Sequence, residues 1–163
     1  MQKKEYQFSF DVYESIQDLT EADAKLLSKA REVTEMAYAP YSHFKVSAVA
    51  LMNNDEMVNG TNQENASYPV TICAERVLLS AVSSIFPNEA IDTIAISYNS
   101  KNSAVPISPC GVCRQALAEY EERTHQPIRL ILSGMQGEVF IIKNATDLLP
   151  LSFKSSSLKN STK

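Results

Sequence analysis

The sequence predicts an α/β protein, a three-layer or two-layer sandwich around one mixed central sheet of about five strands. Apolar residues recur at helical spacing in some segments and form short β-branched runs in others. These segments follow one another in the order αββαβαββ. With 163 residues, 44% of them hydrophobic, the chain has enough apolar material for one core. We therefore predict a single domain over residues 1–163.

The first regular element is a helix that begins at Thr20. Residues 1–19 show no sustained period, so we predict an extension that packs on the surface or stays mobile. Thr20 is a suitable cap, and acidic residues follow it in the first turn. The helix ends before Pro40, and its apolar residues recur at spacings of four and three: Leu26, Ala30, Val33 and Ala37.

A hairpin and a second helix follow. Residues 44–52 (FKVSAVALM) are strand-like, residues 53–55 form a polar turn, and residues 57–62 return as the partner strand. Thr71 is the expected cap of the second helix, which Phe86 and Pro87 stop. Cys73 is thus predicted to lie in a first helical turn.

The last predicted elements are a strand at 91–98, a helix at 110–122 and two strands at 128–133 and 138–142. Ser108 and Pro109 fit the cap and the first position of the helix, because proline lacks the amide donor that this position does not use. Cys110 and Cys113 therefore also lie at a helix start. The Ser/Lys-rich tail, residues 154–163, is predicted to be flexible.

Charge and hydropathy exclude some classes of protein. The net charge of -4 and the pI of about 5.2 have the wrong sign for binding through phosphate neutralisation, so no nucleic-acid partner is expected. No apolar run approaches the 18 residues of a membrane span, and the amino end has no apolar core behind its lysines. We predict a cytoplasmic protein without a membrane partner.

Three cysteines favour a metal over disulfides, since an odd number leaves one thiol unmatched. A CxxC pair alone is a weak signal, because it is equally typical of redox sites or of buried apolar positions. Cys110 and Cys113 share a helix face, however, and Cys73 lies in the corresponding turn of the preceding helix. Three ligands with an open fourth position are typical of catalytic zinc. His43 and His125 lack ligand spacing and are interpreted as turn or surface residues.

Charged residues next to the cysteines suggest how such a site would work. Three thiolates make a Zn²⁺ site net negative, which weakens its acidifying effect on water. Two helix amino termini, with Arg76 and Arg114 beside the ligands, would offset that charge. Glu75 is near enough to Cys73 to face a water at the metal and move protons. A first-turn glutamate alone is more often a helix-dipole partner, and the arginines could equally be solvated.

Four segments together resemble the zinc deaminases, in the all-cysteine variant, and in particular the small cytidine deaminases of pyrimidine salvage. The resemblance covers roughly residues 20–153. The segments are YSHFKV at 41–46, NQENASYP at 62–69, TICAER at 71–76 with PCGVCRQ at 109–115, and LLP at 148–150 followed by Phe153.

The resemblance implies an α/β/α sandwich and hydrolytic deamination of cytidine or 2′-deoxycytidine by a zinc-activated water, with one Zn²⁺ per chain and Glu75 as acid and base. It places Asn62 and Glu64 at the ribose 3′-hydroxyl, Phe44 against the nucleoside and the Ala74 amide at the pyrimidine carbonyl. A buried polar pair of this kind rewards a ligand that satisfies it.

The resemblance also implies a homotetramer with shared active sites, in which Ala66, Tyr68 and Phe153 reach a neighbouring chain. This sequence departs from the family in its longer amino extension, its longer tail, and Ser47 in place of a common glycine. The first two changes concern quaternary geometry. The third is expected to tighten packing behind the site.

Three alternatives remain open at this point. The first is a deaminase of another cytosine-bearing compound such as blasticidin S, for which Asn62 and Glu64 would matter less. The second is a structural zinc module, in which Glu75 would have no role. The third is a nucleic-acid editing enzyme, which the acidic composition disfavours.

Overall fold

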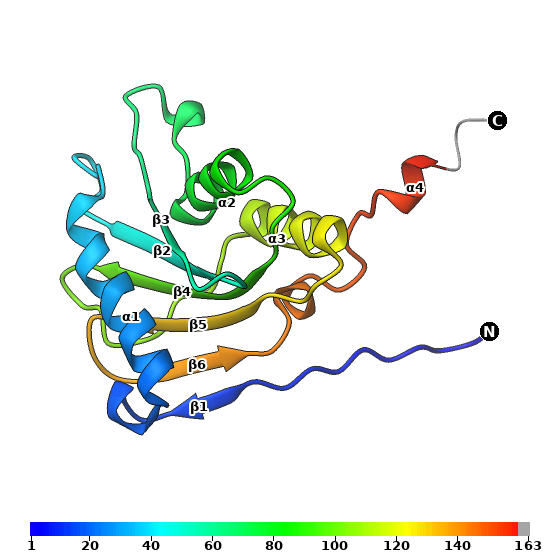
Figure 1. The fold of residues 1–163 in the computed structure, drawn as a ribbon, viewed down its shortest axis with the longest axis horizontal. Helices are drawn as coiled ribbons and strands as arrows, with labels where there is room; N and C mark the ends of the chain where they lie inside the picture. Colours follow the sequence, from blue (N-terminus) through cyan, green and yellow to red (C-terminus); the bar gives the residue numbers. More distant parts are fainter. Residues whose placement is uncertain (160–163) are drawn as a thin grey trace.

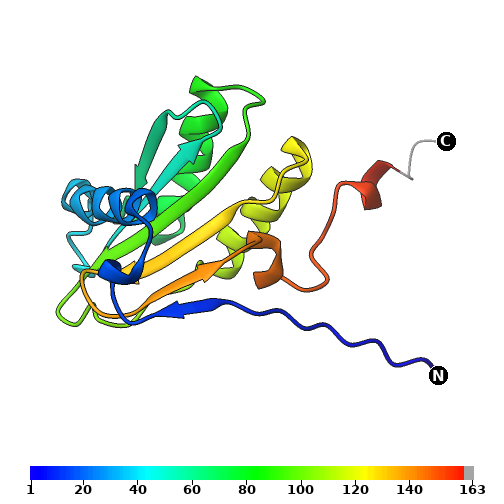
Figure 2. The same ribbon diagram turned by 60° about the horizontal axis from the view of Figure 1, so that its bottom comes forward.

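The computed structural model describes residues 1–159 and contains one mixed sheet in the strand order β1-β6-β5-β4-β2-β3. Helix α1 covers one face of this sheet, and α2 and α3 cover the other (Figures 1 and 2). The strands are β1 (Asp11–Tyr13), β2 (Lys45–Met52), β3 (Met57–Thr61), β4 (Ile91–Asn99), β5 (Arg129–Gly134) and β6 (Val139–Ile142). The longer helices are α1 (Glu21–Val33), α2 (Ala74–Ile85) and α3 (Gly111–Thr124). The predicted α/β/α sandwich is confirmed.

Strand direction explains why two helices begin side by side. Strand β2 is antiparallel to both of its neighbours, β3 and β4, so these two strands run in the same direction. Helix α2 follows β3 and α3 follows β4, so both helices start from the same edge of the sheet. Strands two apart in a sheet lie about 10 Å from each other, which is also the spacing of packed helices. This edge therefore gathers two helix amino termini.

The helix starts differ in part from those predicted. Thr20 caps α1 as expected, since its hydroxyl accepts a hydrogen bond from the Asp23 amide at 3.2 Å. Helix α2 is capped by Cys73 and not by Thr71, and α3 by Cys110 and not by Ser108. The general preference for hydroxyl caps misplaced both starts by two residues.

Two apolar cores lie on the two faces of the sheet. The larger is between the sheet and helices α2 and α3, and the smaller is under α1. Gly60 in β3 allows α2 to approach closely, because a methyl group there would lie 2.6 Å from the Ala74 carbonyl oxygen. On the opposite face, the buried Ser47 hydroxyl donates a hydrogen bond to the Ala30 carbonyl of α1. Ser47 thus ties the sheet to α1 on the face away from the site.

The amino extension contributes a sixth strand to the sheet, against the five or so that were predicted. Strand β1 pairs antiparallel with β6, and Val12 lies opposite Phe140. The same extension contains a short 3₁₀ helix, Ile16–Asp18. Two more 3₁₀ segments matter for the site: η3 (Tyr68–Val70) and η4 (Ala145–Leu148).

The predicted flexible tail falls partly outside the described residues, which end at 159. Within the described part, a short helix α4 spans Ser156–Lys159. Ser155 donates hydrogen bonds to the Glu122 carboxylate through its amide, at 3.2 Å, and through its hydroxyl, at 2.7 Å. Among residues 1–159, no helix is long and apolar enough to cross a membrane.

Candidate active site

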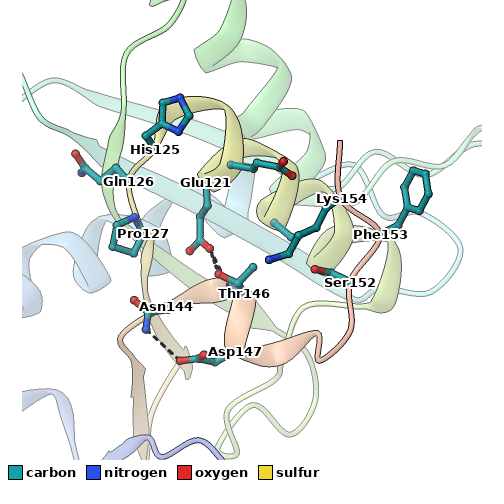
Figure 3. A pocket seen from close by; sticks show the side chains of 12 residues that line it. Glu121, His125, Gln126, Pro127, Asn144, Thr146, Asp147, Ser152, Phe153 and Lys154 are labelled. Carbon is teal, nitrogen blue, oxygen red and sulfur yellow. Dashed lines mark hydrogen bonds between the residues drawn. The ribbon is translucent and has the colours of Figure 1, made fainter. Parts of the chain in front are cut away.

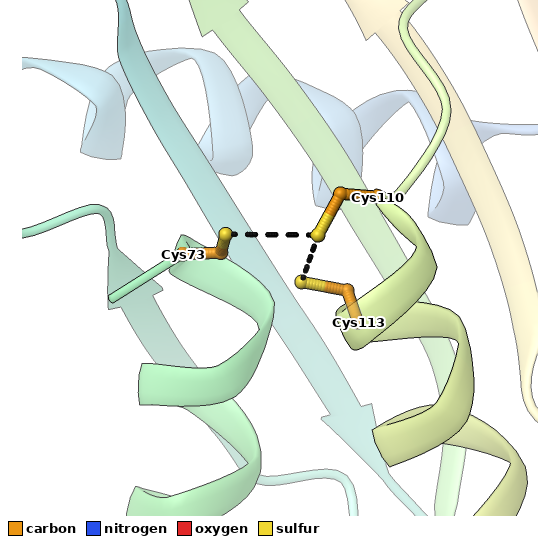
Figure 4. A group of neighbouring side chains, drawn as sticks. All are labelled: Cys73, Cys110 and Cys113. Atoms are coloured by element: carbon orange, nitrogen blue, oxygen red, sulfur yellow. Dashed lines mark hydrogen bonds between the residues drawn. The ribbon is translucent and has the colours of Figure 1, made fainter. Parts of the chain in front are cut away.

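The three cysteine sulfurs meet at the shared helix starts (Figure 4). The Sγ atoms of Cys73 and Cys110 are 3.9 Å apart, those of Cys110 and Cys113 are 3.5 Å apart, and all three lie within 4.8 Å of one another. Cys73 and Cys110 are the N-caps of α2 and α3, so the positive ends of two helix dipoles point toward the sulfurs. This arrangement favours thiolates.

The thiols are strongly coupled to one another. The hydrogen bond from Cys113 lowers the pKa of the Cys73 thiol to about 6, against the opposing effects of burial and of Glu75. The same bond, together with burial and the charge of Glu75, raises the pKa of the Cys113 thiol. Thiols packed this closely are suited to a cation that replaces their protons.

Glu75 lies in the first turn of α2, beside the sulfurs, and is 5% exposed. Burial raises the pKa of its carboxyl above the ordinary range. The neighbouring Ala74 is fully buried, and helix geometry leaves its backbone N–H without a partner inside the helix. Ala74 and Glu75 line the same cavity, so a backbone amide donor and a carboxyl that burial makes easier to protonate lie side by side in its wall.

A cavity of about 440 Å³ is lined by Cys73, Cys110 and Glu75, and the buried Cys113 lies behind it in the sulfur cluster. Sequence reasoning identified several residues of its wall: Phe44, Asn62, Glu64, Tyr68, Cys73, Ala74, Glu75 and Cys110. It missed the others, which are Ser42, Val46, Thr71, Ile72, Ile107 and Ser108. Ile107 and Ser108 belong to the connection before α3, and no motif in the sequence pointed to them.

Asn62 and Glu64 both hold the mouth of the cavity in shape. The Asn62 side chain accepts a hydrogen bond from the Val46 amide and donates one to the Phe44 carbonyl, each at 2.8 Å. One N–H and one lone pair of this amide are left over for a ligand. Glu64 accepts hydrogen bonds from the Ser42 hydroxyl and from the Tyr41 amide, and these lower the pKa of its carboxyl. Glu64 is therefore charged at neutral pH.

The two arginines next to the cysteines have different surroundings. Arg114 donates hydrogen bonds to the Pro109 carbonyl at 2.8 Å, the Leu148 carbonyl at 3.0 Å and the Ser108 hydroxyl at 3.1 Å. It thus fixes the segment that leads into Cys110 rather than the sulfurs themselves. Arg76 is exposed on α2, and its charge is a small contribution to the lowered pKa of Cys73, behind the Cys113 hydrogen bond.

Ala66 and Phe153 do not line the cavity of their own chain. Ala66 adjoins it in a neighbouring depression, and Tyr68 is 83% exposed at the boundary of the two. Phe153 is 61% exposed and lies at a separate cavity of about 320 Å³ beside the end of α3 (Figure 3). Both histidines occupy left-handed turn positions, with φ of 57° at His43 and 55° at His125. Their interpretation as turn residues is confirmed.

An α/β/α sandwich with three clustered thiols and a buried carboxyl at one cavity is typical of a metal-dependent hydrolase. The model of the family described as "Cytidine and deoxycytidylate deaminase zinc-binding region" matches residues 20–126. The chain belongs to this zinc-binding deaminase family, as the motifs predicted.

Individual relatives agree with the family match. A cytidine deaminase of Halalkalibacterium halodurans is 35% identical over 135 residues, which are 83% of this chain and 96% of the relative. The crystal structure of a cytidine deaminase from Burkholderia pseudomallei superposes with a TM-score of 0.70 at 37% identity, covering 83% of this chain and all of that one. A blasticidin-S deaminase of Bacillus cereus is more distant, at 27% identity over 142 residues, 83% of this chain and 95% of its own.

Proposed function

We propose that this protein converts cytidine, 2′-deoxycytidine or both, with water, to uridine or 2′-deoxyuridine and ammonia, as a single domain over residues 1–163. The observation that supports it most is a cluster of three cysteine sulfurs, within 4.8 Å of one another, at a cavity of about 440 Å³ that Cys73, Cys110 and the buried Glu75 line. The family match and the named relatives support this reaction.

The sulfur geometry fits one zinc ion per chain, held by Cys73, Cys110 and Cys113. Two sulfurs bound at about 2.3 Å to a tetrahedral zinc lie about 3.8 Å apart. Two of the three distances in the cluster, 3.5 Å for Cys110–Cys113 and 3.9 Å for Cys73–Cys110, bracket that value. A zinc ion with three protein ligands keeps a place for water and makes that water more acidic.

Glu75 is the proposed proton carrier. Its carboxylate takes one proton from the water that attacks C4 of the pyrimidine and passes it to the ring nitrogen N3. It then takes the second proton from the new hydroxyl on C4 and passes it to the amine, which leaves as ammonia while the C4 carbonyl forms. Burial suits this work, because it raises the pKa of the carboxyl and so makes a proton easier to hold between the two transfers. The Ala74 amide is the proposed donor to the pyrimidine carbonyl oxygen.

Nucleoside recognition is proposed for the opposite wall. The charged Glu64 and the remaining amide hydrogen of Asn62 would bind the ribose 3′-hydroxyl, and the Phe44 ring would pack against the nucleoside. Arg114 positions the Cys110 segment through its three hydrogen bonds, and Arg76 supplies positive potential. The cavity wall is thereby divided between chemistry and recognition.

We further propose a homotetramer with shared active sites. Ala66 and Phe153 are exposed and lie outside the cavity of their own chain, and Tyr68 is 83% exposed at the edge of that cavity, as expected of groups that complete a neighbour's site. Light scattering would give the mass in solution. Mixing a Phe153→Ala variant with a Glu75→Gln variant, after dissociation and reassembly, would restore turnover if sites are shared. Absence of restoration would contradict sharing.

The proposed setting is cytoplasmic pyrimidine salvage, with a free nucleoside and not a nucleic acid as the partner. The net charge of -4 supports this choice, because a polynucleotide would be repelled. Retention of single-stranded DNA at low salt would contradict it.

The decisive experiment compares wild type with Glu75→Gln. Wild type is expected to bind one zinc per chain and convert both nucleosides, followed by loss of the absorbance of the amino-pyrimidine. The variant should keep its zinc and lose at least about 100-fold in kcat. Unchanged activity in the variant would leave the metal a purely structural role. Chelation of the metal should abolish turnover and lower the melting temperature.

The second candidate substrate is blasticidin S, which the Bacillus cereus relative favours. Ribose recognition discriminates between the two substrates. Replacing Glu64 by Ala should damage cytidine turnover much more than turnover of a compound without ribose. Faster conversion of blasticidin S than of either nucleoside by wild type would reverse the assignment.

A further inference from the structure

The amino-terminal arm, residues 6–12, places its large side chains on the site face of the sheet. Val12 in β1 lies opposite Phe140 in β6, so both side chains are on the face that α2 and α3 cover. Side chains alternate in an extended chain, which puts Phe10 and Phe8 on that same face. Figure 1 shows the arm continuing past the end of β6, toward the segment that contains η4.

Phe10 and Tyr6 attach the arm to the body of the protein. The rings of Phe10 and Phe140 have centroids 5.1 Å apart, and those of Phe8 and Phe10 are 6.2 Å apart. The Tyr6 hydroxyl donates to the backbone carbonyl and to the carboxylate of Asp147, each at 3.0 Å. The arm is thus fixed at both ends, by the β1 pairing and by Tyr6.

Between those ends the arm faces the connection that enters α3 across a small cavity. Phe8 and Phe10 share a small cavity of about 190 Å³ with Pro106, Ser108 and Leu148. Ser108 also lines the active-site cavity, so this connection has the arm on one side and the substrate site on the other. Arg114 links this connection to η4, because it donates hydrogen bonds to the Ser108 hydroxyl and to the Leu148 carbonyl.

This connection needs support, because residues 100–110 contain no helix or strand and yet end in a cysteine of the metal cluster. Ligand geometry tolerates displacements of only about 0.5 Å before function suffers. On the inner side, the Tyr98 hydroxyl holds the connection through the Val105 carbonyl, at 2.8 Å. On the outer side, the Phe8 and Phe10 rings line the same small cavity as Pro106 and Ser108.

We propose that Phe8 and Phe10 form a strap that positions the Ser108–Cys110 segment, so that the arm controls how firmly zinc is held and how well substrate is bound. The arm lies outside the region that the family model matches, residues 20–126. The strap would therefore be an addition of this chain to a common site. It rests on the proposed function only in taking Cys110 as a zinc ligand.

The test measures zinc release and hydrogen exchange as well as turnover. In the full-length protein carrying Phe8→Ala and Phe10→Ala, transfer of zinc to a chromogenic chelator should be about tenfold faster, the low end for loss of support around a ligand. Amide exchange of Ile107, Ser108 and Cys110 should rise, and KM for cytidine should rise more than kcat falls. The double variant with Phe8→Leu and Phe10→Leu keeps large apolar side chains and should release zinc nearly as slowly as wild type.

Val12→Ala is the matched control, because it removes an apolar side chain from the same face of the same arm but outside the shared cavity. Zinc release in the double variant no faster than in this control would overturn the proposal. Phe8→Ala alone leaves the Phe10–Phe140 contact next to β1, and serves if the double variant does not fold. Faster zinc release in the double variant, combined with no cytidine turnover by wild type, would support the strap and contradict the proposed function.

Discussion

The ring of Phe44 stacks on the ring of Tyr98, with centroids 5.1 Å apart and planes 25° from parallel. Tyr98 is in the central strand β4, and its hydroxyl donates to the Val105 carbonyl. One residue thus supports both the aromatic wall of the cavity and the connection that leads to Cys110. Sequence reasoning had assigned Tyr98 only to a strand.

Tyr98→Phe is expected to raise KM for the nucleoside about fivefold, the equivalent of one lost hydrogen bond of about 1 kcal/mol. The variant keeps the stacking on Phe44 but frees the Val105 carbonyl. Steady-state kinetics would measure the change, with Tyr98→Ala as the larger perturbation. An unchanged KM in the Phe variant would mean that stacking alone matters.

Gly60→Ala is expected to destabilise the protein by about 1–3 kcal/mol and to lower its zinc content. The added methyl would lie 2.6 Å from the Ala74 carbonyl oxygen and so displace α2 together with Cys73. Gly111→Ala is the control, since a methyl there meets nothing within 4 Å although it adjoins Cys110. Denaturant titration and metal analysis would compare them, and equal effects would contradict the packing explanation.

The Asp23–Arg129 ion pair should make stability depend on pH in the acid range. Its two hydrogen bonds, 2.6 and 2.7 Å long, join α1 to β5 and hold the pKa of Asp23 below its ordinary value of 3.8. A depressed carboxyl pKa stabilises the folded state above the unfolded pKa, and this contribution disappears as the pH falls through the folded value.

Asp23→Asn should therefore cost about 1 kcal/mol at pH 7, after allowance for partial exposure, and progressively less below about pH 4. Urea titrations of both proteins from pH 2 to 7 would measure the difference. A difference that stays constant over this range would exclude the ion pair as its source.

Glu121→Gln is expected to cost about 2–4 kcal/mol, because a buried carboxylate that collects several donors would be replaced by a group that itself donates. Glu121 is 7% exposed and accepts from the Ile128 amide at 2.7 Å and the Ala145 amide at 2.9 Å, as well as from Thr146 (Figure 3). The exposed Glu119→Gln is the matched control in the same helix. Thermal unfolding would measure both, and similar melting temperatures would contradict this role.

Periodicity predicted the elements that have a buried face long enough to show it, such as α1 and β4. Strand β1 was missed because three residues are too few for alternation, and it forms only where β6 offers an edge. The starts of α2 and α3 were misplaced because cap preferences describe isolated helices. The cysteines take those positions, and chain topology brings them together.

The site was predictable where chemistry is concentrated in short motifs, and less so where it depends on loops. Cys73, Cys110, Cys113 and Glu75 could be grouped because all four were expected at two successive helix starts, and the structure brings the three sulfurs together beside Glu75. Ile107 and Ser108 carry no such signal, since their place in the cavity follows from how residues 100–110 cross the edge of the sheet. The partners of Arg114 were likewise beyond reach, because two of them are backbone carbonyls.

Because β2 starts beside the cavity and β3 returns to it, the turn that joins them, residues 53–56, lies at the opposite border of the sheet. Asn53 is paired there with Gln126, which follows the far end of α3. Extra residues or a fluorescent reporter grafted into this bend would sit a whole strand length from the sulfurs. A label in this turn can thus report on the protein without contacting the sulfur cluster or the cavity.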